Sequence, residues 1–266
     1  SFLTLSLFIF LILFFILSIF SGKINFFKLI FFSEHESSLE ILKILFWEIR
    51  LPRTVLALVA GFSLGICGAA MQGLFRNPLA DPSIIGVTAS AGLGSVIVFY
   101  FGLANLFFFA LPLGGIICAT VSVLIIYLII QKNVSILVII LTGVAINTFS
   151  SALISLTLNV SPSPYAAYEI MFWLLGSLAD KNFDHILIII PLAILGWFII
   201  LFSKKWLSAL SLGEETAQSM GLDLKIFRSQ IIIGSALSIG SVVSITGGIS
   251  FIGLVVPHLL RPLYNY

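Results

Sequence analysis

Residues 83 to 131 contain no charged side chain, and this 49-residue run restricts what the chain can fold into. A helix of about 20 residues crosses the hydrocarbon core of a bilayer. The run is therefore too long for one span and must fold back once. We expect the turn near Gly102 to Asn105, between two membrane-spanning helices.

Composition supports a membrane environment for the whole chain. It is 60% hydrophobic and 9% charged, with a mean hydropathy of +1.21, whereas soluble domains carry about 25% charged residues. The net charge of +2 and the lack of a basic cluster give no indication of nucleic-acid binding. Cys67 and Cys118 lie in apolar runs, where cysteine behaves as a small hydrophobic residue. We expect both to be packing residues, and nothing supports a disulfide or a metal site.

The charged residues divide the rest of the chain into further apolar runs. These predict an all-α polytopic transmembrane helix bundle with about eight spans, and a single transmembrane domain over residues 1–266. Lys23 to Arg50 is expected to be a polar segment, and Glu169 to Leu178 a short interfacial or re-entrant piece. The first run is interpreted as a true span and not as a signal peptide. The expected spans are Phe2–Phe20, Thr54–Phe75, two within Ser83–Gln131, Val134–Leu158, Ile186–Ser203, Ser229–Ile245 and Ile249–Leu260.

Small residues are concentrated in the second and third spans. Gly61 and Gly65 have the spacing that lets two helix backbones approach closely. Four small residues are expected to do the same in the third span: Gly86, Ser90, Gly92 and Gly94. This pattern predicts a tightly packed bundle and does not by itself indicate transport.

Arg50 and Arg53 flank Pro52 at a membrane boundary. On a helical turn, their spacing would direct both side chains outward together. They could anchor the helix by snorkelling to lipid headgroups. Alternatively, they form a cationic pair that meets acidic residues of a docking protein.

The Arg76–Pro82 segment ends the second span with two prolines and an asparagine, which specify a turn. One interpretation is a loop that only caps a helix. The other is part of a gate at the mouth of a pathway, with Asn77, Pro78 and Asp81 as its residues.

The Leu212–Gly221 segment predicts a short exposed helix between two spans. Glu214 and Glu215 stand in its first turn, where carboxylates interact favourably with the helix dipole. Gly221 is placed to end it in a left-handed conformation. Ala217 and Met220 would share one face. The segment is either an interfacial amphipathic helix or a rigid element that docks into a soluble subunit.

Several catalytic signatures are missing from the sequence. It has no Gly-x-x-x-x-Gly-Lys-Ser/Thr run, no Gly-x-Ser-x-Gly and no His-Glu-x-x-His. The expected spans contain no Asp, Glu, Lys or Arg of the kind that proton relays use, which argues against an ion-coupled transporter. Two rival classes are an intramembrane enzyme, which needs a pair of polar catalytic side chains, and a secondary transporter, which needs coupling residues at membrane depth.

Five segments, taken in order, resemble the permease subunits of ferric-siderophore, haem and vitamin B12 ABC importers, the FecCD-type or type II importers. The resemblance runs from about Leu51 to Arg261. The segments are Leu51-Pro-Arg53, Arg76-Asn-Pro-Leu-Ala-Asp-Pro82 with Gly86-Val87, Trp173-Leu-Leu-Gly-Ser-Leu178, Leu212-Gly-Glu-Glu-Thr-Ala217 with Gly221, and Gly248-Ile-Ser-Phe-Ile-Gly-Leu-Val-Val-Pro-His-Leu-Leu-Arg261.

This resemblance implies a ten-span permease domain with an inside N-terminus in the bacterial inner membrane. It implies a dimer with a second permease copy, identical or different, two cytoplasmic ATP-binding subunits and an extracytoplasmic substrate-binding protein. The chain itself would be no enzyme, with no catalytic residue, metal or cofactor, because the partner subunits hydrolyse ATP. Arg50 and Arg53 would dock the binding protein, and Asn77, Pro78 and Asp81 would form a cytoplasmic gate loop. The ATPase coupling helix would comprise Gly213, Glu214, Glu215, Ala217, Met220 and Gly221.

The expected cargo is an iron–siderophore complex, with vitamin B12 or haem as alternatives. Family members continue through two further spans after the Pro-His-x-x-Arg segment, whereas this sequence stops at Tyr266. We therefore expect a C-terminally truncated copy that inserts into the membrane without assembling a working importer.

Overall fold

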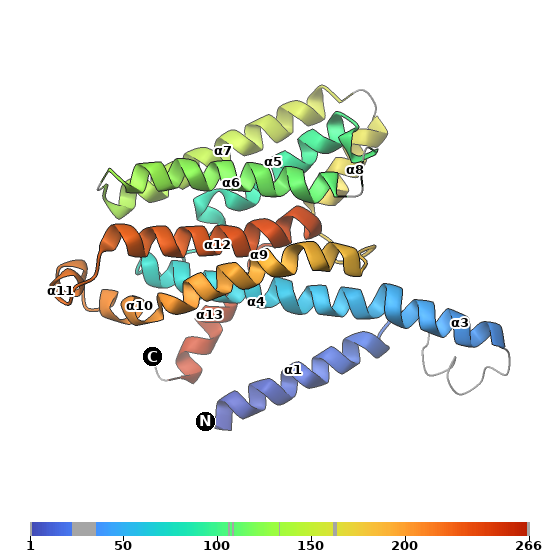
Figure 1. Cartoon of the computed structure of the whole chain (residues 1–266), viewed down its shortest axis with the longest axis horizontal. Helices are drawn as coiled ribbons and strands as arrows, with labels where there is room; N and C mark the ends of the chain where they lie inside the picture. Colours follow the sequence, from blue (N-terminus) through green and yellow to red (C-terminus); the bar gives the residue numbers. More distant parts are fainter. Residues whose placement is uncertain are drawn as a thin grey trace. The chain divides into compact units, whose positions relative to one another are not determined.

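The computed structural model describes residues 2–22, 36–105, 107, 109–132, 134–161 and 164–264. All regular structure within these ranges is helical, which confirms the predicted fold class (Figure 1). The elements are α1 (Phe2–Phe20), α3 (Glu36–Ile44), π-helix η1 (Leu45–Arg50), α4 (Leu51–Leu74), 3-10 helix η2 (Pro82–Ile85), α5 (Val87–Tyr100), 3-10 helix η3 (Leu103–Asn105), α6 (Ala110–Ile130), α7 (Ile136–Asn159), α8 (Pro164–Leu174), α9 (Phe183–Phe202), α10 (Lys204–Leu210), α11 (Glu214–Ser219), α12 (Leu224–Thr246) and α13 (Ile252–Leu263).

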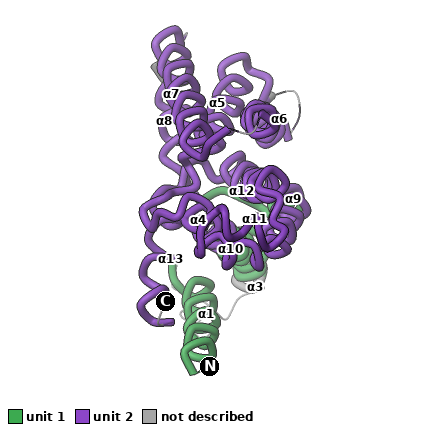
Figure 2. Tube along the Cα trace, turned by 90° about the vertical axis from the view of Figure 1, so that its left-hand side faces the viewer, with its two compact units in different colours: residues 1–59, 178–187 green, residues 60–177, 188–266 purple. Residues whose placement is uncertain are grey.

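The chain divides into two compact units (Figure 2). Unit 1 comprises Ser1–Val59 and Leu178–Leu187, and unit 2 comprises Ala60–Ser177 and Ile188–Tyr266. The divisions fall inside two continuous helices, α4 and α9. Unit 1 holds the N-terminal helices, and unit 2 holds most of the bundle.

The predicted spans correspond to observed helices. Within the described ranges, six helices are long and apolar enough to cross a membrane, and α5 and α13 are shorter apolar helices. The long run folds back between α5 and α6, with η3 in the expected turn. The six candidate spans are Phe2–Phe20, Glu40–Leu74, Ala110–Ile130, Ile136–Asn159, Phe183–Phe202 and Leu224–Thr246.

The observed elements differ from the prediction in several places. Residues 36–50, expected to be a polar segment, are helical and lead directly into α4, because isolated charges interrupt apolar runs without breaking the backbone. The short piece expected at Glu169–Leu178 is α8, which begins at Pro164, a residue that fits the first turn of a helix. The additional helix α10 precedes α11 and was not predicted.

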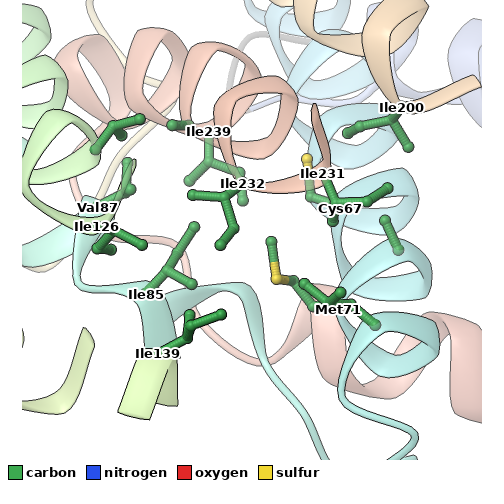
Figure 3. Packing of buried hydrophobic residues seen from close by; sticks show 14 of the residues in the cluster. Cys67, Met71, Ile85, Val87, Ile126, Ile139, Ile200, Ile231, Ile232 and Ile239 are labelled. Carbon is green, nitrogen blue, oxygen red and sulfur yellow. The ribbon is translucent and has the colours of Figure 1, made fainter. Parts of the chain in front are cut away.

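Unit 2 is organised around α12, which is buried along most of its length and contacts α5 and α6. Figure 3 shows part of this core, where isoleucines of α12 lie close to residues from several other helices. Cys67 is fully buried there and makes no disulfide, which confirms it as a packing residue, while Cys118 is half-buried. The labelled core residues are Cys67, Met71, Ile85, Val87, Ile126, Ile139, Ile200, Ile231, Ile232 and Ile239.

Close helix crossings occur at other glycines than predicted in α4. A Cβ atom added at Gly61 or Gly65 would meet no heavy atom of the described chain within 4 Å, so the prediction for these two is wrong. At Gly68 the added atom would lie 1.8 Å from the carbonyl oxygen of Gly253 in α13. At Gly94 it would lie 2.0 Å from the carbonyl oxygen of Gly114, which confirms a close approach in α5.

We predict that Gly68→Ala destabilises unit 2 by about 1–3 kcal/mol, because the new methyl group forces α4 and α13 apart. Gly61→Ala is the matched control on the same helix, where alanine has open space and improves helix propensity by up to about 1 kcal/mol. The measurement is the apparent Tm of each purified variant in detergent. Equal Tm values for the two variants would contradict the close crossing.

Candidate functional site

The short helix α11 has the predicted ends. Gly213 precedes it at φ 111°, and Glu214 and Glu215 occupy its first turn. At its other end the amide of Gly221 donates to the carbonyl oxygen of Gln218 at 2.9 Å, and that of Leu222 to Ala217 at 3.0 Å. With Gly221 at φ 94°, this is a Schellman motif, in which glycine avoids the steric cost of the left-handed conformation.

Ala217 and Met220 lie in different environments, contrary to the prediction that they share an exposed face. Ala217 is fully buried and belongs to the hydrophobic core of unit 2, whereas 58% of Met220 is exposed. A partner protein can reach Met220 and Glu215 but not Ala217. A bulky residue at position 217 would therefore disturb the core before it tested any contact.

Arg228 connects α11 to two other parts of the bundle. Its Nη2 donates to Oε1 of Glu214 at 2.9 Å, and its Nη1 donates to the carbonyl oxygen of Val134 at 2.8 Å. Only 9% of the Arg228 side chain and 30% of the Glu214 side chain are exposed. One guanidinium on α12 thus holds the start of α11 and the segment just before α7, an arrangement that we call the Arg228 clamp.

The sequence interpretation missed this clamp because it started the span at Ser229. The helix begins at Leu224, which places Arg228 inside it. A cation on a mostly buried helix requires partners, since desolvating an unpaired charge is costly. The position of Arg228 one turn inside the helix is the signal that could have found it.

The predicted gate loop is a defined turn. Oδ1 of Asn77 accepts the amide of Leu79 at 2.9 Å, and Oδ1 of Asp81 accepts the amide of Ser83 at 2.8 Å, which caps η2. Asn77 and Pro78 are exposed. This geometry agrees with the capping interpretation, and a gate remains a prediction.

A buried amide lies just before the gate loop. Nε2 of Gln72 donates to the carbonyl oxygen of Leu254 at 3.1 Å, which ties the end of α4 to α13. The loop therefore leaves α4 where that helix is held both by this bond and by the Gly68 crossing.

Arg50 and Arg53 do not point outward together. Arg50 is buried, and its Nη1 donates to the carbonyl oxygen of Ile19 at 2.8 Å, whereas Arg53 is exposed. The change to a π-helix before Leu51 alters the spacing of side chains around the axis. Arg50 thus stabilises the C-terminal end of α1, and Arg53 is the accessible cation of the pair.

The bundle geometry defines the class of protein: a multi-pass α-helical membrane protein with a short connecting helix clamped to its core. Comparison with known proteins gives the family. The FecCD transport family matches residues 7–266, and the chain belongs to this family. This membership confirms the resemblance found in the sequence and locates the chain in the bacterial inner membrane.

Individual relatives agree. The chain is 35% identical over 223 residues to the uncharacterized ABC transporter permease protein YvrB of Bacillus subtilis, covering 82% of this chain and 63% of the relative. It is 36% identical over 216 residues to the vitamin B12 import system permease protein BtuC of Salmonella typhi, covering 81% and 65%. The chain thus spans somewhat less than two thirds of the length of these curated relatives.

A solved structure shares the arrangement of helices. It is described as an inward-facing conformation of a metal-chelate type ABC transporter, and it matches with a TM-score of 0.86 at 30% identity. The match covers 98% of this chain and 81% of the other.

We predict that Glu214→Gln lowers the free energy of unfolding by about 1–3 kcal/mol, because it leaves the Arg228 guanidinium without its counter-charge. Glu215→Gln is the matched control, since it changes the next residue of the same turn, which is exposed, and should stay within about 0.5 kcal/mol of wild type.

The measurement is unfolding in mixed micelles, with Arg228→Gln completing a double-mutant cycle for Glu214. A coupling energy of at least about 1 kcal/mol is expected for two groups in direct contact. A coupling energy near zero, or equal losses for Glu214→Gln and Glu215→Gln, would show that the clamp contributes nothing.

Proposed function

We propose that this chain is the permease subunit of an ATP-binding-cassette importer and that it moves a metal chelate across the inner membrane. The observation that carries the proposal is the match of nearly the whole chain to a metal-chelate type ABC transporter at 30% identity. Family membership over residues 7–266 supports the same role. The subunit binds no cofactor of its own and leaves ATP hydrolysis to a partner, so it is not itself an enzyme.

The proposed cargo is an iron–siderophore complex, and vitamin B12 is equally supported because BtuC belongs to a vitamin B12 import system. Both are large chelates that hold their metal internally, and haem shares this property. A pathway for such cargo needs no metal-ligating side chains. The described ranges contain no group of three His, Cys, Asp or Glu side chains placed to hold a metal ion, which is compatible with this cargo.

The proposed partners are a second permease copy, cytoplasmic ATP-binding subunits, an extracytoplasmic binding protein and membrane lipid. The exposed part of α11, with Met220 and Glu215, is the proposed contact for the ATPase. Arg53 is the proposed contact for acidic residues of the binding protein, with Arg50 supporting the helix behind it. Asn77, Pro78 and Asp81 remain the proposed cytoplasmic gate loop.

The Arg228 clamp could transmit motion of α11 to the membrane-spanning helices. A displacement of α11 acts on Glu214, and the two bonds of Arg228 carry it to α12 and to the segment before α7. Ala217, the buried residue of α11, packs this helix against the core, so the helix does not move independently of it. A push at one exposed surface can thus reach two long helices.

The test is uptake of radiolabelled iron–siderophore and of cobalamin by proteoliposomes that contain the full-length complex. We predict uptake of one chelate that requires ATP, the ATPase and the binding protein together. With limiting binding protein, Arg53→Glu should lower the rate about tenfold or less, because exposed charge pairs are screened by salt. Uptake that continues without ATP would contradict an ABC importer, and competition between the two chelates decides the cargo.

A further inference from the structure

One face of unit 2 carries two cavities along the helices α6, α9 and α12. The first, which we call the inner cavity, has a volume of about 100 Å³ and lies among Ala119, Thr120, Leu192, Leu237 and Gly240, with other residues of the same three helices. The second, the outer mouth, has a volume of about 570 Å³ and lies where α6 and α9 end and α12 begins. Figure 1 shows α12 between α6 and α9.

The two cavities are adjacent because both are lined by Ile233. From Ser229 in the outer mouth to Ser241 in the inner cavity, α12 advances by 12 residues, or about 18 Å. This is close to half the thickness of the hydrocarbon core of a bilayer, which is about 15 Å. Together they form a groove of roughly the length of one lipid leaflet.

The inner cavity offers an apolar environment only. Its two hydroxyl groups are used inside their own helices, since Oγ1 of Thr120 donates to the carbonyl oxygen of Ile116 and Oγ of Ser241 donates to that of Ser238. The remaining lining is aliphatic or glycine. A ligand in this cavity therefore gains from burying hydrocarbon and finds no polar group to bond.

The outer mouth is lined both by hydrogen-bond donors and by apolar side chains. Oγ of Ser229 is buried and has no partner among the described residues, and Lys225 and Gln131 also line the mouth. Oε1 of Gln230 accepts a hydrogen bond from Oγ of Ser203. The side-chain NH2 group of Gln230 is therefore left to donate to a ligand. A buried hydroxyl without a partner is costly unless something bonds it.

The one carboxylate in the mouth is already engaged. Oδ1 of Asp223 accepts the amides of Lys225 and Ile226 at 2.8 and 3.2 Å, so it caps α12. The positive end of the helix dipole offsets its charge. The Lys225 ammonium then stands among neutral donors, which suits an anionic group.

We propose that this groove binds one glycerophospholipid of the surrounding bilayer, with its phosphate in the outer mouth and a segment of one acyl chain in the inner cavity. Other occupants fit less well. An α-helix with its side chains is about 10 Å across and cannot enter a cavity of about 100 Å³. A polar chelate would leave its own hydrogen bonds unmade in the inner cavity. The phospholipid matches both ends of the groove.

The test is native mass spectrometry of the purified chain titrated with dioleoylphosphatidylglycerol. We expect one retained lipid in the wild type. Thr120→Phe fills the inner cavity from its exposed edge and should weaken retention about tenfold, as expected for displacing a buried acyl segment. The matched control is Thr142→Phe, a partly exposed threonine on α7 that has the same bond to its own helix and lines neither cavity.

Lys225→Gln and Ser229→Ala test the outer mouth. Each should weaken retention several-fold to about tenfold, because hydrogen bonds to charged groups are the strong ones. Lys204→Gln is the control, an exposed lysine at the start of α10 outside the groove. Circular dichroism and gel filtration confirm that each variant is folded, and the mouth variants decide the outcome if Thr120→Phe is not.

Equal retention by Thr120→Phe and Thr142→Phe would overturn the proposal, and so would equal retention by Lys225→Gln and Lys204→Gln. A wild type that retains no phospholipid, with Thr120→Phe instead weakening association with another membrane protein, would identify a protein occupant and also overturn it. None of these results depends on transport.

Discussion

A charged side chain on a helix buried in a bilayer-spanning bundle is stable only when the protein supplies its partners. Arg228 meets this constraint with one carboxylate and one carbonyl oxygen, drawn from two different connections between helices. The arrangement of α11 depends on it, because a helix of six residues has too few internal hydrogen bonds to hold its own position. The clamp fixes the start of α11, and the burial of Ala217 fixes its middle.

The lipid environment also explains how the rest of unit 2 is packed. Lipid gives little hydrophobic drive for helices to associate, so close packing at small residues replaces it. Gly68 against Gly253 and Gly94 against Gly114 bring backbones into contact. The groove beside α12 is the exception, where α6, α9 and α12 line a cavity of about 100 Å³.

Much of the fold could be predicted because the thickness of the bilayer sets how many consecutive apolar residues a spanning helix needs. The uncharged run over residues 83–131 indicated two helices and a turn, and Gly221 marked the end of α11. Local patterns could not show which face of a helix becomes covered. Gly61 and Gly65 have the spacing of a helix contact but face open space, and Ala217 was paired with an exposed face although it is buried. The π-helix at Leu45–Arg50 turns Arg50 inward, and no local sequence pattern predicts such a helix.

The central proposal is that the exposed part of α11 receives the motion of an ATPase and passes it to the bundle. The most direct measurement is chelate-dependent ATP turnover by the assembled complex with Met220→Glu, compared with Lys204→Glu on α10. Both residues are exposed, so neither change disturbs the core. Met220→Glu is expected to lower coupled turnover about tenfold or more, because it places a charge in an apolar contact, while Lys204→Glu stays near wild type. Equal turnover by the two variants, with each complex intact, would contradict it.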